Sequence, residues 1–259
     1  MTSGTPHEYR SRLQVRVGGF FRNTVRVPGQ TCSVCTGPST LPLCRQCYAQ
    51  QQEFGERLAS SVLTLTYVRG DTAHQSVHTV RAYKRDPPAP RCAENLATMI
   101  AAATKIHGRC ITESTGSPWE AITFVPSKNY PVTEHPVVGL ARKAAGASIP
   151  GNQVLLELGP GIADKNRVVR DDRFVLSEQH RERVRGRHVL LIDDTWVTGA
   201  KIQSAAVTLR DAGASRVTAL CVARWCKVGW ADHKALLDSR TDPYDPFICP
   251  VSGKNCVER

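Results

Sequence analysis

Short apolar runs alternate with amphipathic stretches through most of the chain. Apolar runs predict strands at 62–67, 119–125, 153–158, 188–192 and 216–222. Apolar residues at helical spacing predict helices at 77–83, 93–106, 135–145 and 199–212. Strands that alternate with helices indicate an α/β fold, with a mostly parallel sheet flanked by helices.

The pattern is weaker at both ends of the chain. Residues 1–30 hold five arginines against one acid, Glu8, so we expect a basic flexible arm. Residues 31–60 combine a Cys-rich segment with a polar connector that can be helical. We expect the main α/β domain at 61–225, and an irregular tail rich in Cys and Pro at 226–259.

Length and composition indicate a folded protein. A chain of 259 residues fits one domain of ordinary size with an appendage, and 41% hydrophobic with 22% charged residues argues against disorder or a fibrous repeat. The only uncharged run of 18 residues, Val27–Cys44, is rich in Pro, Gly, Ser and Thr, so we expect no membrane span. No apolar signal segment opens the chain, so we expect a cytoplasmic protein. The net charge of +11 favours polyanionic or phosphorylated partners.

Four of the ten cysteines form a paired motif. Cys32-x2-Cys35 is followed after eight residues by Cys44-x2-Cys47. Two such turns can supply the four thiolates of a tetrahedral zinc site, and the segment has too few apolar residues to fold by burial alone. A structural zinc ion is therefore expected, with a thioredoxin-like redox pair as the weaker alternative.

The other six cysteines give weaker signals. Cys92, Cys110 and Cys221 are interpreted as small buried residues of the core. Cys249 and Cys256 leave open a second metal site or a local cross-link, with Cys226 as a further partner.

The stretch 189–201 carries the main functional signal. A buried strand ends in Asp193 and Asp194, and a short loop with Thr198 and Gly199 leads into a helix. Carboxylates at a strand end can bind sugar hydroxyls, and a helix N-terminus suits a phosphate, so the stretch predicts a sugar-phosphate site. The alternative is a solvated Asp-Asp turn before a capped helix. A phosphatase motif would need Asp-x-Asp, and a Walker B strand would need a P-loop that is absent from the sequence.

This stretch resembles the phosphoribosyl pyrophosphate (PRPP) signature of type I phosphoribosyltransferases. The chain as a whole is similar to the ComF family, the competence-associated branch in which a zinc-ribbon-like N-terminal module precedes a phosphoribosyltransferase domain. The two CxxC turns and the segments 67–70, 78–84 and 125–128 support the resemblance, which covers roughly residues 30–225.

The resemblance implies roles for individual residues. Asp193 and Asp194 would be catalytic and hold the ribose hydroxyls. PRPP would also be bound by Thr195, Trp196, Val197, Thr198, Gly199, Ala200 and Lys201 around the 5′-phosphate, and by Ser127 and Lys128 at the pyrophosphate. Segment 159–174 would be a mobile hood with Lys165, Arg167, Arg170 and Arg173. The family usually has Thr-Thr-Gly-x-Thr or Ser in the phosphate loop, whereas Val197 and Lys201 here remove two hydroxyls and add a cation.

The implied reaction is that of a glycosyltransferase, the transfer of a phosphoribosyl group with release of pyrophosphate. Magnesium would bind together with PRPP. The alternative is a non-catalytic protein of DNA uptake and competence that uses the fold as a ligand-sensing body. Its support is the basic arm, the cluster Arg81, Lys84, Arg85 and Arg91, and the run 181–187. The expected partners are PRPP, single- or double-stranded DNA, and a second copy of the chain.

Overall fold

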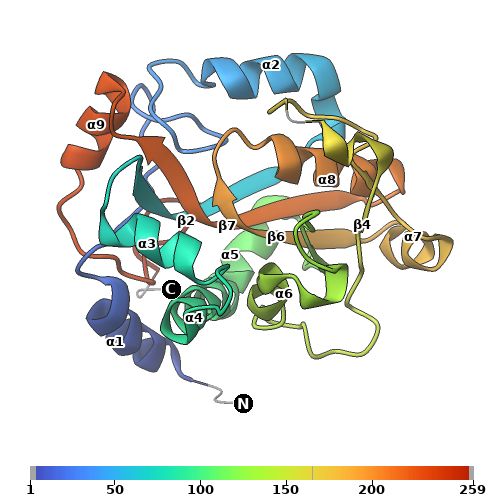
Figure 1. The fold of residues 1–259 in the computed structure, drawn as a ribbon, viewed down its shortest axis with the longest axis horizontal. Helices are drawn as coiled ribbons and strands as arrows, with labels where there is room; N and C mark the ends of the chain where they lie inside the picture. The colour runs from blue at the N-terminus through green and yellow to red at the C-terminus, as the bar shows by residue number, and fades with distance from the viewer. Residues whose placement is uncertain (1–3, 165, 257–259) are drawn as a thin grey trace.

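The computed structural model describes residues 4–164 and 166–256, and in these residues the main sheet has five strands (Figure 1). Their order is β1-β2-β7-β6-β3. The strands are β1 (Arg22–Asn23), β2 (Ser61–Gly70), β3 (Ala121–Phe124), β6 (His188–Trp196) and β7 (Arg216–Lys227). Only the short edge strand β1 runs antiparallel, so the predicted α/β class with a mostly parallel sheet is confirmed.

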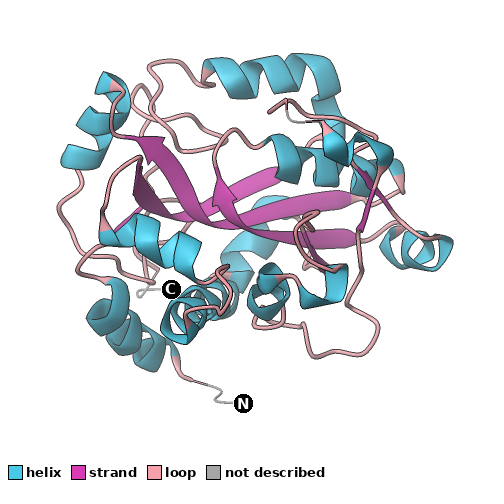
Figure 2. Ribbon diagram, viewed as in Figure 1, coloured by secondary structure: helices cyan, strands magenta, loops and turns pink. Residues whose placement is uncertain are grey.

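Helices cover both faces of this sheet (Figure 2). On one face lie α1 (Pro6–Val17), α3 (Gln75–Ala82), α4 (Pro90–Ile106), α5 (Gly108–Thr115) and α6 (Pro136–Ala141). On the other face lie α2 (Arg45–Phe54) and α8 (Ala200–Asp211). Helices α7 (Glu178–Val184) and α9 (Ala231–Asp238) lie at opposite ends of the molecule in this view.

The period-two alternation of the central strands divides the core into two layers. Leu190 and Ile192 of β6 pack with the α4 side of the sheet, whereas Val189 and Leu191 pack with α8 and the Cys-rich segment. All four side chains are fully buried. A strand buried on both faces reads as a continuous apolar run, which is why β6 is evident in the sequence.

The N-terminal segment differs from the expected basic flexible arm, because residues 6–17 form helix α1. Thr5 and Glu8 make a reciprocal capping box at its start. Leu13 and Val17, four residues apart, are fully buried in the α4 side of the core. The arginines had suggested a solvated segment, but Arg10, Arg12 and Arg16 belong to a helix whose buried residues are only Tyr9, Leu13 and Val17.

Other elements also differ from the sequence predictions. The strand predicted at 153–158 is reduced to a bridge between Gln153 and Ile122 and to β4 (Glu157–Leu158), which pairs with β5 (Phe174–Val175) in a separate sheet. The tail expected to be irregular contains α9, and the boundary placed at 225/226 falls inside β7. Since β7 is buried almost to its end, the chain has no change of packing at that point.

Within the described ranges 4–164 and 166–256, no helix combines the length and the apolar character needed to cross a membrane.

Candidate functional site

Strand β6 carries the two predicted acids at its C-terminal end, still within the strand. Asp194 is buried and Asp193 is half-buried. The backbone N–H of Asp194 donates to Oδ1 of Asp193 at 2.9 Å, which fixes one carboxylate against the chain. The parallel register places the ends of β6 and β7 together, so these acids open into the crevice where α/β sheets bind ligands.

Lys84, just beyond α3, provides the counter-charge. Its Nζ lies 2.6 Å from Oδ2 of Asp194. Burial favours the neutral form of both acids and raises the pKa of Asp193 well above its usual range, with Asp194 adding to this effect. At Asp194 burial again raises the pKa, but the charge and hydrogen bond of Lys84, with further contributions from Asp193 and Tyr83, outweigh it and hold the pKa below its usual value. The pair therefore has two unlike carboxyl groups, and Asp194 is the one that stays ionised.

The loop from β6 into α8 is shaped for close approach of a ligand. Gly199 has φ +79°, and a Cβ there would lie 2.2 Å from the ring of Trp196. Helix α8 begins at Ala200, so the first N–H groups of the helix face this loop. A helix N-terminus at a glycine turn attracts an anionic group such as phosphate.

Two side chains from other elements hold the carbonyl groups of this loop. Nε2 of Gln50, on α2, donates to the carbonyl of Thr198 at 3.0 Å. Nη1 of Arg224, on β7, donates to the carbonyl of Val197 at 3.1 Å. The Cys-rich module, residues 31–60, therefore packs directly on the predicted phosphate loop through α2 and is no separate appendage.

His135 orients Ser127, which lies in the segment 125–128 that is predicted to bind pyrophosphate. Its Nδ1 accepts from the N–H of Val137 at 3.2 Å and caps α6, so the proton of the neutral ring is on Nε2. Nε2 lies 3.1 Å from Oγ of Ser127 and donates to it. Burial, with the charge of Lys84 nearby, lowers the pKa of His135 to about 4. His135 is therefore a neutral donor that orients Ser127.

These elements surround one cavity with a volume of about 740 Å³. Of the predicted site residues, the cavity is lined by Asp193, Asp194, Thr195, Val197, Thr198, Gly199, Ala200, Lys201, Ser127 and Lys128. Trp196 is the exception: it is buried in the α8 side of the core, where its ring supports the glycine turn. The volume suits a small polar ligand.

The predicted hood folds over this cavity as η3 (Pro160–Ala163) and the turn between β4 and β5. Of its cations, Arg167 and Arg173 line the cavity, whereas Arg170 is engaged in ion pairs with Asp164 and Asp172. Lys165 lies outside the described residues. The structure therefore leaves fewer free cations in the hood than the sequence suggests.

The four cysteines of the paired motif come together. The Sγ atoms of Cys32, Cys35, Cys44 and Cys47 all lie within 4.8 Å of one another, and those of Cys35 and Cys44 are 3.8 Å apart. Four thiols with this spacing could hold a zinc ion.

A second cluster includes Cys249 and Cys256, for which the sequence left open a metal site, but its other members are His107 and Cys110 and not Cys226. His107, Cys110, Cys249 and Cys256 offer ligand atoms that all lie within 4.8 Å of one another. The interpretation of Cys110 as a small buried core residue is wrong, because its side chain is only half-buried. Cys92 and Cys221 are buried as expected, and Cys226 is buried away from both clusters. The sequence could not show this grouping, because nearly 140 residues separate its two halves.

The arginines expected to form a basic arm all contact the chain itself. Arg10 pairs with Asp245, and Arg12 and Arg16 pair with Glu94. Arg22 and Arg26 donate to backbone carbonyl groups. These five arginines thus have structural partners, and DNA binding stays a prediction.

Four residues that shape the site were not predicted as site residues: Lys84, His135, Gln50 and Arg224. Lys84 lies in the segment 78–84 that supports the family resemblance, and that was the available signal. The other three act by tertiary contact and have no local motif.

No protein-family model matches the chain, and no curated protein matches it. Among solved structures, the chain is similar to one described as the allosteric regulatory enzyme of purine biosynthesis, with 21% sequence identity and a TM-score of 0.27. The match covers 48% of this chain and 26% of that chain. The chain therefore spans about a quarter of the length of that enzyme.

Proposed function

We propose that the protein has a type I phosphoribosyltransferase domain that binds PRPP in the 740 Å³ cavity and transfers its phosphoribosyl group, releasing pyrophosphate. One observation carries this proposal. Two carboxylates, a glycine turn at the start of α8, and the cations Lys84, Lys128 and Lys201 face the same cavity. Carboxyl groups can bind ribose hydroxyls, and the cations and the start of α8 can bind phosphates. PRPP carries both kinds of group.

Different residues would bind the ribose, the 5′-phosphate and the pyrophosphate of PRPP. Asp194, kept ionised by Lys84, accepts hydrogen bonds from a ribose hydroxyl, and Asp193 accepts or donates beside it. The N–H groups at the start of α8 and the ammonium of Lys201 hold the 5′-phosphate. Ser127, oriented by His135, and Lys128 hold the pyrophosphate.

In the reaction, the bond from C1 of the ribose to the pyrophosphate oxygen breaks and a bond from C1 to the acceptor forms. The acceptor loses a proton, and pyrophosphate leaves with the electron pair. The carboxylate of Asp194 stabilises the positive charge that develops on the sugar, and the hood excludes water.

The cavity also fits a magnesium ion that binds together with PRPP. Magnesium prefers oxygen ligands and keeps several of its waters, so the carboxylate of Asp194 and the oxygens of a polyphosphate suffice. When bound, it neutralises charge on the leaving pyrophosphate. At the other site we propose a structural zinc ion bound by Cys32, Cys35, Cys44 and Cys47, because four thiolates are a donor set that zinc prefers.

Calorimetric titration with PRPP and magnesium tests the binding step. The wild type should release or absorb heat with a saturable isotherm, and Asp193→Asn/Asp194→Asn should weaken binding by at least tenfold. Asp242→Asn, which removes an exposed acid far from the site in sequence, serves as the control and should bind as the wild type does. A flat titration of the wild type would exclude the PRPP site.

Pyrophosphate release tests the transfer step separately. Purine bases, pyrimidine bases and ammonia are offered in turn as acceptors with PRPP and magnesium. Release that depends on one acceptor identifies the substrate class. Binding of PRPP without release for any acceptor would favour a ligand-sensing role.

A further inference from the structure

We propose that His107, Cys110, Cys249 and Cys256 bind a second structural zinc ion, which fastens the C-terminal segment to the junction of α4 and α5. The two halves of the site come from distant parts of the chain. His107-x2-Cys110 spans the end of α4 and the first turn of α5, and Cys249-x6-Cys256 belongs to the C-terminal segment. The four ligand atoms lie within 4.8 Å of one another.

The spacing of the sulfur atoms agrees with a tetrahedral site. Sγ of Cys110 lies 3.6 Å from Sγ of Cys256. Zinc–sulfur bonds of about 2.3 Å at tetrahedral angles place two sulfurs roughly 3.8 Å apart. The corresponding distance between Cys35 and Cys44 in the first cluster is 3.8 Å.

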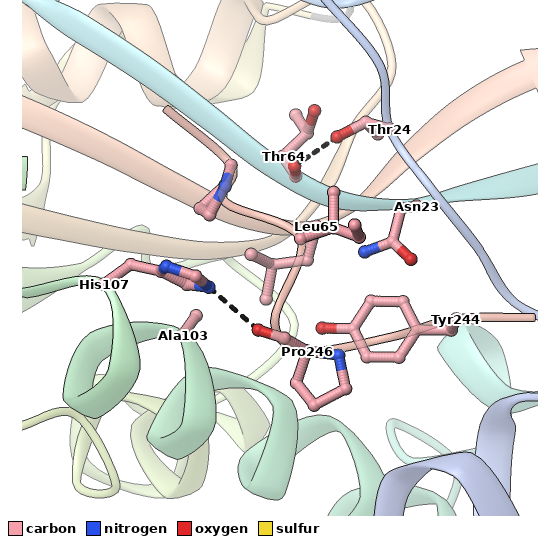
Figure 3. Close-up of a pocket in the computed structure, with 10 residues that line it drawn as sticks. Asn23, Thr24, Thr64, Leu65, Ala103, His107, Tyr244 and Pro246 are labelled. Atoms are coloured by element: carbon pink, nitrogen blue, oxygen red, sulfur yellow. Dashed lines mark hydrogen bonds between the residues drawn. The ribbon is translucent and has the colours of Figure 1, made fainter. Parts of the chain in front are cut away.

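The imidazole of His107 has the hydrogen bonding of a metal ligand. Its Nε2 lies 2.8 Å from the carbonyl oxygen of Pro246 (Figure 3), and a carbonyl only accepts, so Nε2 carries the proton. Nδ1 then has a free lone pair; it is buried and has no hydrogen-bond partner among the residues that the structure describes. Histidines that bind metals usually donate their other N–H to a carbonyl or carboxylate in this way. An orphaned buried nitrogen beside three thiols points to a bound cation.

A tight turn presents the two C-terminal thiols to the same side. Ile248 and Asn255 form an antiparallel bridge, and the N–H of Cys249 donates to the carbonyl of Lys254 at 2.8 Å. Gly253 has φ +72°, which favours glycine and closes the turn. Cys249 is buried and Cys256 is partly exposed, so the site lies at the edge of the core.

The donor set favours zinc over the alternatives. Three thiolates and one imidazole are ligands of a closed structural zinc site, whereas magnesium and calcium prefer oxygen. A disulfide between Cys110 and Cys256 would need a sulfur distance of about 2.05 Å and would leave Cys249 and Nδ1 of His107 unpaired. A zinc ion satisfies all four groups at once.

Metal analysis of the full chain, purified without chelator under reducing conditions, tests the proposal. We expect about two zinc ions per chain in the wild type, about one in Cys256→Ser, about one in Cys44→Ser, and almost none in the double variant. Cys226→Ser is the control, because Cys226 is a buried cysteine that belongs to neither cluster, and it should keep both ions. Loss of a zinc ion in Cys44→Ser but full retention in Cys256→Ser would overturn the proposal.

Two measurements keep the test decisive if a variant folds poorly. Cobalt titrated into metal-free Cys44→Ser should give the intense visible absorption of a tetrahedral cobalt–thiolate site. Hydrogen exchange of wild-type residues 244–256 should rise when zinc is removed by a chelator. A Cys110–Cys256 disulfide found by mass spectrometry in the freshly purified wild type, or cobalt spectra without the tetrahedral bands, would refute the zinc site.

Discussion

Nζ of Lys84 lies 2.6 Å from Oδ2 of Asp194, and this ion pair joins the segment after α3 to the end of β6. The two groups lie on the wall of the same cavity, so the pair fixes the ionised acid where a sugar hydroxyl would bind. The ion pair also places the ammonium group of Lys84 beside the position proposed for pyrophosphate.

Replacing Lys84 by methionine should show how much this ion pair stabilises the fold. Because the charge and the hydrogen bond of Lys84 both lower the pKa of Asp194, this pKa should rise in Lys84→Met. The ion pair of the wild type stabilises the fold above the unfolded pKa of Asp, about 3.9, and this stabilisation is lost as the pH falls through the lower folded pKa. At pH 7, Lys84→Met should cost about 2 kcal/mol, less than for a fully buried pair, because the Lys84 side chain is 35% exposed.

Urea unfolding of Lys84→Met at pH 7 measures this loss, and PRPP titration should show weaker binding in the same variant. Lys84→Arg, which keeps the charge, should recover part of both. Equal stability of Lys84→Met and the wild type at pH 7 would show that the ion pair does not stabilise the fold.

His135 should make the protein sensitive to mild acid. The unfolded chain takes up a proton near pH 6.5, but the folded imidazole does so only near pH 4. Stability should therefore fall as the pH drops through this window, by up to about 1.4 kcal/mol per pH unit from this group.

The matched variant is His135→Asn, because asparagine can still cap α6 but does not titrate. The difference in unfolding free energy between wild type and variant should change with pH between 6.5 and 4. A constant difference over that range would contradict a neutral His135.

Gly199→Ala should distort the phosphate loop. The alanine would need a φ of +79°, and its Cβ would meet the ring of Trp196 at 2.2 Å. The left-handed backbone alone costs about 1–2 kcal/mol, and the collision adds to this. Both the melting temperature and the affinity for PRPP should fall.

Gly151→Ala separates the two effects, because Gly151 has φ +84° with no atom within 4 Å of the added Cβ. It should lose stability from the backbone alone and bind PRPP normally. The prediction fails if the two variants have the same affinity for PRPP.

Gln50 should transmit the state of the Cys-rich module to the phosphate loop. Gln50→Ala removes the hydrogen bond to the carbonyl of Thr198 at a cost of about 1 kcal/mol, while the four cysteines stay in place. We expect an unchanged zinc content and weaker PRPP binding. Gln51→Ala, an exposed neighbour, is the control.

Cys44→Ser should lose zinc and weaken PRPP binding as well. Normal PRPP affinity in both Gln50→Ala and Cys44→Ser would show that the Cys-rich module does not affect ligand binding at the loop.

Local patterns were sufficient for features that depend on neighbouring residues. The apolar run before Asp193, the glycine turn at Gly199 and the two CxxC turns are visible in the sequence, because strand burial, a positive φ and a chelating turn each impose their own residue types. The segments 78–84 and 125–128 were placed near the site by resemblance, and the structure brings Lys84 and Ser127 to the cavity.

Tertiary structure alone decided the rest, because contacts between distant segments leave no periodic signal. The apolar stripe of α1 was hidden among arginines whose partners, Glu94 and Asp245, lie far along the chain. The neutral state of His135 and the ionised state of Asp194 depend on burial and on Lys84. Most clearly, Cys110 could be told from an ordinary core cysteine only when the fold placed it beside Cys256, since four ligands from two distant segments become a site only when both segments are in place.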